Sequence, residues 1–290
     1  MEAKSALKLL SLLLISLLLA GCTIRPADIV NERLATDEHY RVQSVRYGDD
    51  PRHTMDVYVP TNYNGKIPVV YIYGGAWRTG IARDYKFVGH ALTKIGHPVI
   101  IPNYRLYPKV RFPAFVHDVA DAIKYVELRS TLFFGKPLGR FIISGHSAGA
   151  HSAALIMTDD RYLKKAGVRA QVAGLIGLAG PYDLTLENPE VAPVFGNTGP
   201  FSSQPIDFVK PKLAPSLLLH GRDDARVLPY HTRTFTEELR KHGNYVDMHI
   251  YRGVGHYSIV GGVAASMRGM SRSFKEIAQF LSEIEQVHGE

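Results

Sequence analysis

The sequence predicts an α/β fold, in which a mostly parallel sheet carries helices on both of its faces. Short apolar runs alternate along the chain with helical stretches, which is the order that α/β domains show. The apolar runs at 141–143, 174–178 and 217–219 are continuous, as expected for strands that are buried on both faces. A chain of 290 residues, 46% hydrophobic and 21% charged, is sufficient for one such domain.

The expected elements follow from these patterns. The strands are expected at Met55–Val59, Val69–Tyr73, Val99–Asn103, Phe141–Ser144, Val172–Leu178, Ser216–His220 and Val246–Tyr251. The helices are expected at 82–95, 113–129, 147–158, 229–242 and 267–286. The segment 181–215 has weak periodicity, and so long a connection is usually a functional excursion. We therefore expect it to form a small cap over the carboxyl edge of the sheet.

The composition excludes several classes of protein and site. The single cysteine excludes an internal disulfide framework and a zinc site built from cysteines. The chain contains no His-Glu-x-x-His helix, Walker loop or dinucleotide-binding glycine fingerprint. The net charge of +7 is spread without one dense basic block, which favours a basic surface over nucleic-acid binding. We expect neither a metal nor a cofactor, and the sequence leaves the oligomeric state open.

The first residues, 1–21, have the features of an export signal. Lys4 and Lys8 precede an apolar run over 9–20, which is too short to span a bilayer but suits a secretory segment. The run ends Leu-Ala-Gly-Cys, with the cysteine at Cys22. An ordinary signal peptide or a membrane anchor is the alternative interpretation.

This ending resembles the lipobox of bacterial lipoproteins, and the resemblance implies that Cys22 is lipidated, for example with palmitate. Residues 22–40 would then be a tether between the membrane and a domain at 41–290. Acyl chains on one residue can hold a folded domain at a membrane surface. Thr23 stands where an Asp would be the usual inner-membrane signal, so the resemblance favours a bacterial cell envelope protein at the outer membrane.

A candidate nucleophile lies in Gly145-His146-Ser147-Ala148-Gly149. The motif follows an apolar strand and opens an alanine-rich helix, which is the context that makes a sharp elbow and exposes the serine hydroxyl. The flanking glycines suit the close packing of such a turn. A serine is a poor nucleophile until a base takes its proton, so Ser147 needs a histidine.

The histidine is sought downstream of the serine, because the chain order with such an elbow is Ser, acid, His. His256 lies in a loop just after the last predicted strand, at the edge where the elbow also lies, and is the expected base. The other candidates fall on helices or inside strands; they are His151, His220, His231, His242 and His249, apart from the tail His288.

The acid is expected after the preceding strand, where Asp223 and Asp224 are both candidates. The run from His220 to Val227 resembles the H-G-x-x-D-x-x-V turn of many α/β-hydrolases, which places the acid at Asp224 and leaves Asp223 as the alternative. His220 is expected to be a structural hydrogen-bonding residue below the site.

Donors for a developing oxyanion are expected in the loop after an early strand. The strand over 69–73 runs into Gly74-Gly75-Ala76-Trp77, and paired glycines let backbone amides approach a ligand. Together with Asn103-Tyr104-Arg105-Leu106 and the elbow, these residues resemble the HGGxW branch of the α/β-hydrolase superfamily. That branch includes hormone-sensitive-lipase-like carboxylesterases, kynurenine formamidases, feruloyl or acetyl esterases and isoprenylcysteine methylesterases.

The resemblance covers about residues 40–285, and it implies an eight-stranded α/β-hydrolase sheet. It also implies that the amides of Gly75, Ala76 and Ala148 form the oxyanion hole. The motif's usual histidine is Tyr73 here, which puts the rigidity of the loop in doubt. Trp77 and Tyr182 are candidates for substrate contact.

Arg105 and Asp118 are expected to form a scaffold ion pair. With Ser147, Asp224 and His256, the expected function is a serine carboxylesterase that acts on small or medium acyl esters through an acyl-enzyme intermediate. The alternatives are an amidase of the kynurenine formamidase type and a non-catalytic envelope binding protein. The expected partner is a small-molecule ester.

Overall fold

The computed structural model describes residues 31, 34, 39–196, 198–199 and 202–288. The predicted signal segment 1–21, Cys22 and most of the predicted tether lie outside the described residues. In the described part of the chain, no helix combines the length and the apolar character that crossing a membrane requires.

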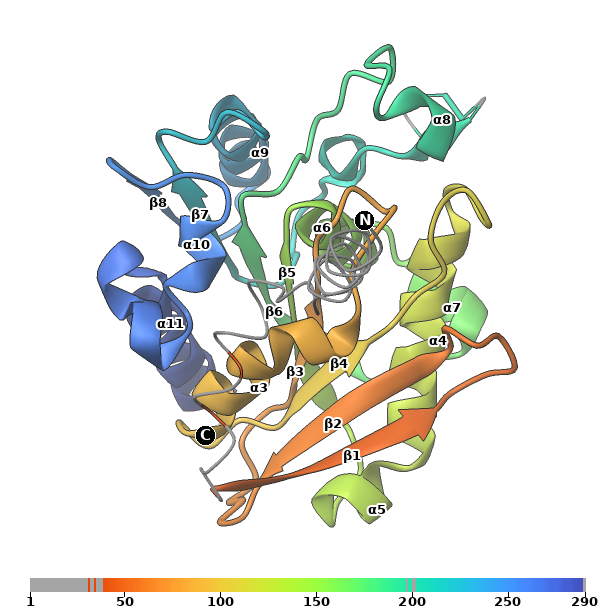
Figure 1. Ribbon diagram of the computed structural model, residues 1–290, viewed down its shortest axis with the longest axis vertical. Coiled ribbons are helices and arrows are strands. Elements are labelled where there is room, and N and C mark those ends of the chain that lie inside the picture. Colours follow the sequence, from red (N-terminus) through yellow and green to blue (C-terminus); the bar gives the residue numbers. More distant parts are fainter. Residues whose placement is uncertain (1–30, 32–33, 35–38, 197, 200–201, 289–290) are drawn as a thin grey trace, which may run out of the picture.

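One sheet of eight strands organises the molecule, in the order β1-β2-β4-β3-β5-β6-β7-β8 (Figure 1). The strand β2 runs antiparallel to both of its neighbours, and all other neighbouring strands are parallel. The strands are β1 Tyr40–Arg46, β2 Thr54–Pro60, β3 Val69–Ile72, β4 Val99–Pro102, β5 Arg140–His146, β6 Gln171–Leu178, β7 Ser216–Gly221 and β8 Val246–Tyr251. The predicted fold class, a mostly parallel sheet with helices on both faces, is confirmed.

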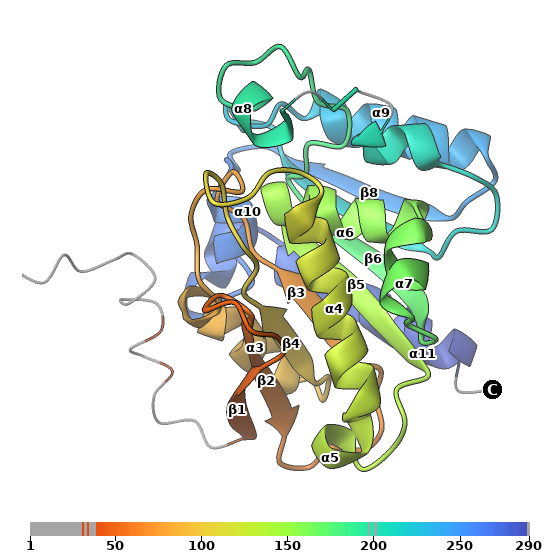
Figure 2. The ribbon, with the colours of Figure 1, turned by 90° about the vertical axis from the view of Figure 1, so that its right-hand side faces the viewer.

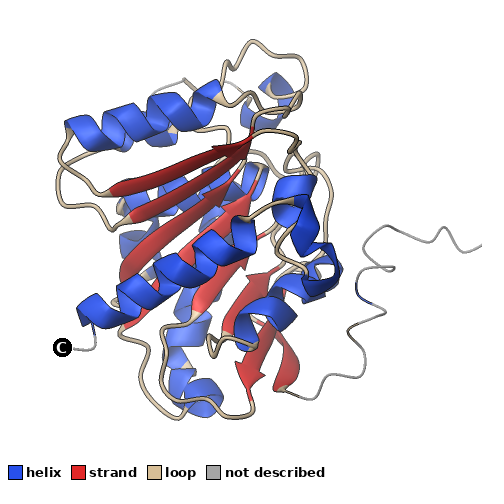
Figure 3. Ribbon diagram, turned by 90° about the vertical axis from the view of Figure 1, so that its left-hand side faces the viewer, coloured by secondary structure: helices blue, strands red, loops and turns tan. Residues whose placement is uncertain are grey.

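Helices cover both faces of this sheet. One face carries α4 and α6 (Figure 2), and the other carries α3 and α11 (Figure 3). The helical elements are η1 Ala82–Tyr85, α3 Lys86–Thr93, α4 Ala114–Leu128, α5 Ser130–Phe134, α6 Ala148–Thr158, α7 Arg161–Ala166, α8 Ala192–Phe195, η3 Pro205–Phe208, α9 Tyr230–Lys241, α10 Ser258–Gly261, η4 Ala265–Met270 and α11 Ser273–His288. The continuous apolar runs lie in the buried strands β5, β6 and β7, as predicted.

Several elements differ from the sequence prediction. The helix expected at 82–95 is divided between η1 and α3, and the helix expected at 267–286 begins only at Ser273, after η4. The edge strand β1 was not predicted as a strand. Most of its residues are exposed, including Val42 at 49%, so it carries no buried face that hydrophobic alternation could reveal.

The stretch predicted as a tether is in part packed against the domain. The side chain of Asn31 donates to the carbonyl oxygens of Arg83 and Asp84 at 3.0 and 3.3 Å and accepts from the backbone N–H of Phe87 at 3.1 Å. Leu34 is buried in the hydrophobic core. The folded unit therefore includes residues before the predicted boundary at 41, and these residues meet it where η1 passes into α3.

The segment 181–215 lies over the carboxyl edge of the sheet, where it carries α8 and η3 (Figure 2). Parallel strands bring their carboxyl ends to the same edge, so the loops after β3, β5, β6, β7 and β8 converge below this cap. That edge is the place where ligands bind in open α/β sheets.

Candidate active site

The turn between β5 and α6 has the strained backbone expected of a nucleophile elbow. Ser147 has φ 55° and ψ −125°, a conformation that costs a non-glycine residue about 1–3 kcal/mol. A Cβ on Gly145 would lie 2.4 Å from the carbonyl carbon of Gly149, and one on Gly149 would lie 2.0 Å from the carbonyl oxygen of Ile72. Both positions therefore require glycine, because backbone atoms occupy the space of a side chain.

Three side chains from separate loops form one line of hydrogen bonds at this elbow. The Nε2 atom of His256 lies 2.9 Å from the Oγ atom of Ser147. The Nδ1 atom of His256 lies 2.7 Å from the Oδ2 atom of Asp224. All three residues are buried, so these interactions take place with little competition from water.

Asp224 is held by four groups in the turn after β7. Its Oδ1 atom accepts the backbone N–H groups of Arg226 and Val227, each at 2.9 Å, and its Oδ2 atom faces His256 and lies 3.3 Å from Nε2 of His220. Burial alone would raise the pKa of Asp224, but the hydrogen bonds from His220, His256 and Val227 hold that pKa well below its usual range. The carboxylate is therefore charged at neutral pH.

The two acid candidates take different positions. Asp224 faces His256, whereas the side chain of Asp223 is exposed and its backbone N–H donates to the carbonyl oxygen of Val254. His220 also lies where it was expected, since its ring bridges Thr232 and the carbonyl oxygen of Val227 at 2.7 and 2.8 Å.

His146 holds the backbone of His256 in place, a contact that was not predicted from the sequence. The Nε2 atom of His146 lies 2.9 Å from the carbonyl oxygen of His256, which can only accept, so this nitrogen carries the proton. Burial and the neighbouring His256 lower the pKa of His146 to about 3, so its ring is neutral. The signal available in the sequence was its position inside the Gly-His-Ser elbow motif.

The loop after β3 passes directly against the nucleophile. A Cβ on Gly74 would lie 3.0 Å from the Cβ of Ser147. Gly75, Ala76 and Trp77 have φ values of 123°, 51° and 58°, so three successive residues adopt a left-handed backbone. Such a backbone lets consecutive amides face one side of the loop, as an anion-binding site requires. Ala148 opens α6, and the first amides of a helix have no partner within it.

Tyr73, which stands in place of the motif's usual histidine, anchors this loop from below. Its hydroxyl accepts from Arg52 at 2.8 Å and donates to the side-chain oxygen of Asn103 at 3.1 Å. Its ring is stacked against Tyr85 and Tyr104, with centroid distances of 5.4 and 4.7 Å. These hydrogen bonds and ring contacts hold the start of the loop in place, although the motif's usual histidine is absent.

Two cavities meet at Ser147. The larger, about 720 Å³, lies on the side of His256, and the smaller, about 250 Å³, lies below the cap. Ser147 and Arg226 line both. Ser147 therefore stands between two spaces that could receive the two halves of one substrate.

The two residues predicted to contact substrate are placed differently. Trp77 is buried against Phe115 and Phe195 and lines the smaller cavity. Tyr182 is completely buried, is stacked on Phe235 at 4.5 Å and lines neither cavity, so the structure does not place it for the predicted contact with substrate. The chain turns back after β6 and the ring fills the space over Gly180, where a Cβ would lie 2.4 Å from Cζ of Tyr182.

Over the described residues, no group of three or more histidine, cysteine, aspartate or glutamate side chains is arranged to hold a metal ion.

Comparison with known families and sequences gives three findings. Residues 55–239 match the BD-FAE family. A probable isoprenylcysteine alpha-carbonyl methylesterase of Arabidopsis thaliana is 27% identical over 244 residues, which cover 75% of this chain and 51% of that protein. A kynurenine formamidase of Salmo salar is 31% identical over 142 residues, covering 49% of this chain and 46% of that protein. The chain spans about half the length of the curated relatives it matches.

Solved structures show the same fold. A truncated carbohydrate esterase from gut microbiota superposes with a TM-score of 0.75 at 22% identity, covering 87% of this chain and 99% of that one. The apo form of Thermogutta terrifontis esterase 2 superposes with a TM-score of 0.72 at 20% identity, covering 88% of this chain and 97% of that one.

Proposed function

The chain belongs to the BD-FAE family of α/β-hydrolases, and from this premise and the geometry around Ser147 we propose that it is a serine-dependent carboxylic ester hydrolase. The observation that carries the proposal is the hydrogen-bonded line from Ser147 through His256 to Asp224, with distances of 2.9 and 2.7 Å. These lengths fit a nucleophile, a general base and a group that orients the base. The esterases among the relatives and structural neighbours support the same reaction class.

The first half of the proposed reaction forms an acyl-enzyme. The Oγ atom of Ser147 attacks the ester carbonyl carbon while Nε2 of His256 takes the hydroxyl proton. Asp224 stabilises the resulting imidazolium and does not take a proton itself. The carbonyl oxygen becomes an oxyanion that accepts hydrogen bonds from the amides of Gly75, Ala76 and Ala148, each worth roughly 10²–10³ in rate. His256 then gives its proton to the leaving alcohol oxygen, and the C–O bond breaks.

The second half repeats the chemistry with water. His256 takes a proton from a water molecule, the hydroxide attacks the acyl-serine carbon, and the oxyanion again lies among the loop amides. Collapse of this intermediate returns the proton from His256 to Ser147 Oγ and releases the carboxylic acid. Apart from the ester and water, both halves of the reaction use only groups of the described chain.

A fluorophosphonate probe tests the proposal, because it reacts with an activated serine and requires no knowledge of the substrate. We expect labelling of the wild-type protein, hydrolysis of p-nitrophenyl acetate and butyrate, and loss of both in Ser147→Ala. Ser152→Ala on the same helix is the matched control, because Ser152 is buried and its hydroxyl donates to the carbonyl oxygen of Ala148. Labelling that persists in Ser147→Ala, or an unreactive wild-type protein, would refute the proposal, and the latter would favour a binding protein.

An amidase of the kynurenine formamidase type is the second candidate, and the match to the Salmo salar enzyme favours it. The same three side chains can cleave an ester or a formamide, since both reactions pass through an oxyanion and need a proton on the leaving group. Comparison of kcat/KM for N-formylkynurenine and for p-nitrophenyl acetate separates the two. A higher value for the formamide would replace the esterase assignment.

We further propose that the protein is lipidated at Cys22 and held at the bacterial outer membrane. The proposal rests on the Leu-Ala-Gly-Cys ending of an apolar export segment and on Thr23 after it. Metabolic labelling with a palmitate analogue should mark the wild-type protein and not Cys22→Ser, which should accumulate as an unprocessed or soluble form. Equal membrane fractionation of the two proteins would contradict the anchor.

A further inference from the structure

The walls of the two cavities at Ser147 come from different elements. The larger cavity is lined by residues of η1, α3, α10 and η4 and by His256 with its loop. Its apolar lining is contributed by Tyr85, Phe87, Tyr257, Val260, Ala264 and Met267. The smaller cavity is closed by the cap, through Pro181, Leu184, Asn188 and Val191, and by Trp77.

The chemistry of acyl transfer assigns a direction to each half of the substrate. The leaving oxygen must lie beside Nε2 of His256, because that atom returns the proton. His256 lines the larger cavity and not the smaller one. The oxyanion accepts hydrogen bonds from the backbone amides of the loop after β3. The acyl chain therefore takes the remaining direction, toward the smaller cavity, which Ala76 and Ala148 line.

Resting on the proposed function, we infer that this hydrolase is built for esters in which a short acyl group is joined to a bulky, largely apolar alcohol. The alcohol occupies the larger cavity beneath α10 and η4, and the acyl group occupies the smaller cavity beneath the cap. Pockets that bind drug-sized ligands have volumes of roughly 300–1,000 Å³. The larger cavity, about 720 Å³, is in that range, and the smaller, about 250 Å³, is below it.

The two cavities differ in character as well as in size. The alcohol side offers mainly apolar side chains, beside the polar Thr79, Asp84 and Arg226, and each additional methylene in apolar contact improves binding by about fourfold. The acyl side is more mixed, since polar side chains of Thr185, Asn188 and His231 also line it. A long acyl chain would therefore exceed the smaller cavity and leave its outer methylenes in water.

A pair of isomeric esters tests this orientation directly. Octyl acetate and ethyl octanoate contain the same atoms and both release a primary alcohol, so they differ only in which side of the ester is long. We expect wild-type kcat/KM for octyl acetate to exceed that for ethyl octanoate by at least tenfold, measured by acid release at constant pH. Equal values, or a preference for ethyl octanoate, would overturn the inference.

Two substitutions probe the cavities separately. Met267→Trp fills the larger cavity from a half-buried position on η4, and we expect it to lower the ratio of octyl acetate to ethyl acetate turnover about tenfold. Leu184→Ala enlarges the smaller cavity and should raise kcat/KM for ethyl octanoate relative to octyl acetate. Leu132→Trp is the remote control, because Leu132 is 74% exposed on α5, and it should change neither ratio.

The probe and ester measurements together distinguish a failure of the proposed orientation from a failure of the proposed esterase activity. A protein that reacts with neither the fluorophosphonate probe nor p-nitrophenyl acetate refutes the esterase itself, and the orientation with it. A protein that reacts with both but prefers ethyl octanoate is an esterase with the opposite orientation. An unchanged ratio of octyl acetate to ethyl acetate turnover in Met267→Trp, together with an unchanged ratio of ethyl octanoate to octyl acetate turnover in Leu184→Ala, would show that these cavities do not receive the two halves of the ester.

Discussion

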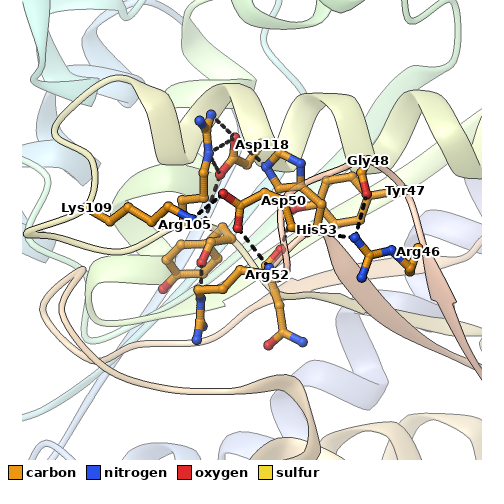
Figure 4. Close-up of polar contacts among 11 residues, drawn as sticks. Arg46, Tyr47, Gly48, Asp50, Arg52, His53, Arg105, Lys109 and Asp118 are labelled. Atoms are coloured by element: carbon orange, nitrogen blue, oxygen red, sulfur yellow. Dashed lines mark hydrogen bonds and ion pairs between the residues drawn. The ribbon is translucent and has the colours of Figure 1, made fainter.

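Two carboxylates in this molecule are equally buried but differ in their partners. Asp118, on α4, receives the guanidinium of Arg105 at 2.6 Å and the backbone N–H of the same residue at 2.8 Å, with the ring of His53 at 3.3 Å (Figure 4). Its charge is thus matched by a cation that is permanently present. This is the scaffold ion pair expected from the sequence, and it ties the segment after β4 to α4.

Asp224 instead meets histidine rings and backbone amides. Its partners are the imidazoles of His220 and His256 and the backbone amides of Arg226 and Val227. These donors stabilise the carboxylate, and in the proposed reaction its charge stabilises an imidazolium that exists only during the reaction. The comparison indicates that a fixed cation makes a buried carboxylate structural, whereas a histidine partner leaves it able to act in catalysis.

The largest effect is expected from Asp224→Asn. The amide keeps the shape but favours the wrong tautomer of His256, so kcat should fall about 10⁴-fold, equivalent to about 5 kcal/mol. Hydrolysis of p-nitrophenyl acetate by the purified variant measures the loss, and a thermal unfolding curve checks that the protein is folded. Asp223→Asn is the control and should retain activity; the reverse outcome would move the acid to Asp223.

At Asp118 the comparison predicts a loss of stability without a loss of activity. Arg105→Met leaves Asp118 buried without its guanidinium, and removal of one partner from a buried pair costs about 3–5 kcal/mol. We expect the free energy of unfolding in urea to fall by about 3 kcal/mol, since His53 remains as a partner, while kcat of the folded protein changes little. A large loss of kcat with unchanged stability would contradict the scaffold role.

The sequence predicted those parts of the fold and site that leave a local pattern. Continuous apolar runs indicated the buried strands, and the elbow motif indicated Ser147. The edge strand β1 was missed because its residues are mostly exposed, so neither face carries an apolar pattern. Propensity likewise gave no indication of α5 and α7, which are only 5 and 6 residues long.

The parts of the site that were missed depend on tertiary packing. Tyr182 follows β6 at the correct edge, but the turn directs its ring onto Phe235, and no local pattern reports that direction. Val260, Ala264 and Met267 line the larger cavity, although no motif marks them. His146 was overlooked for a related reason: its hydrogen bond reaches the carbonyl oxygen of a residue 110 positions away.

The smallest effect concerns the buried, neutral ring of His146 and the dependence of stability on pH. Burial lowers the pKa of His146 to about 3, whereas a histidine in the unfolded chain takes up a proton near pH 6.5. Between these values the unfolded state binds one more proton, so this residue costs the folded state stability as pH falls below about 6.5. His146→Gln keeps an N–H donor for the carbonyl oxygen of His256 and removes the titration. From pH 7 to pH 5 the variant should therefore lose about 2 kcal/mol less unfolding free energy than the wild type.

Urea unfolding at the two pH values measures this difference, and His151→Gln should behave similarly, because burial also lowers the pKa of His151 to about 3. Parallel losses in the wild type and the His146 variant would show that this ring takes up a proton in the folded state as readily as in the unfolded chain, so that a cation would lie beside His256 at pH 5. A smaller loss in the variant would show that the ring of His146 stays neutral in the folded protein, so that no fixed cation from this residue offsets the charge of Asp224, in contrast with Arg105 at Asp118.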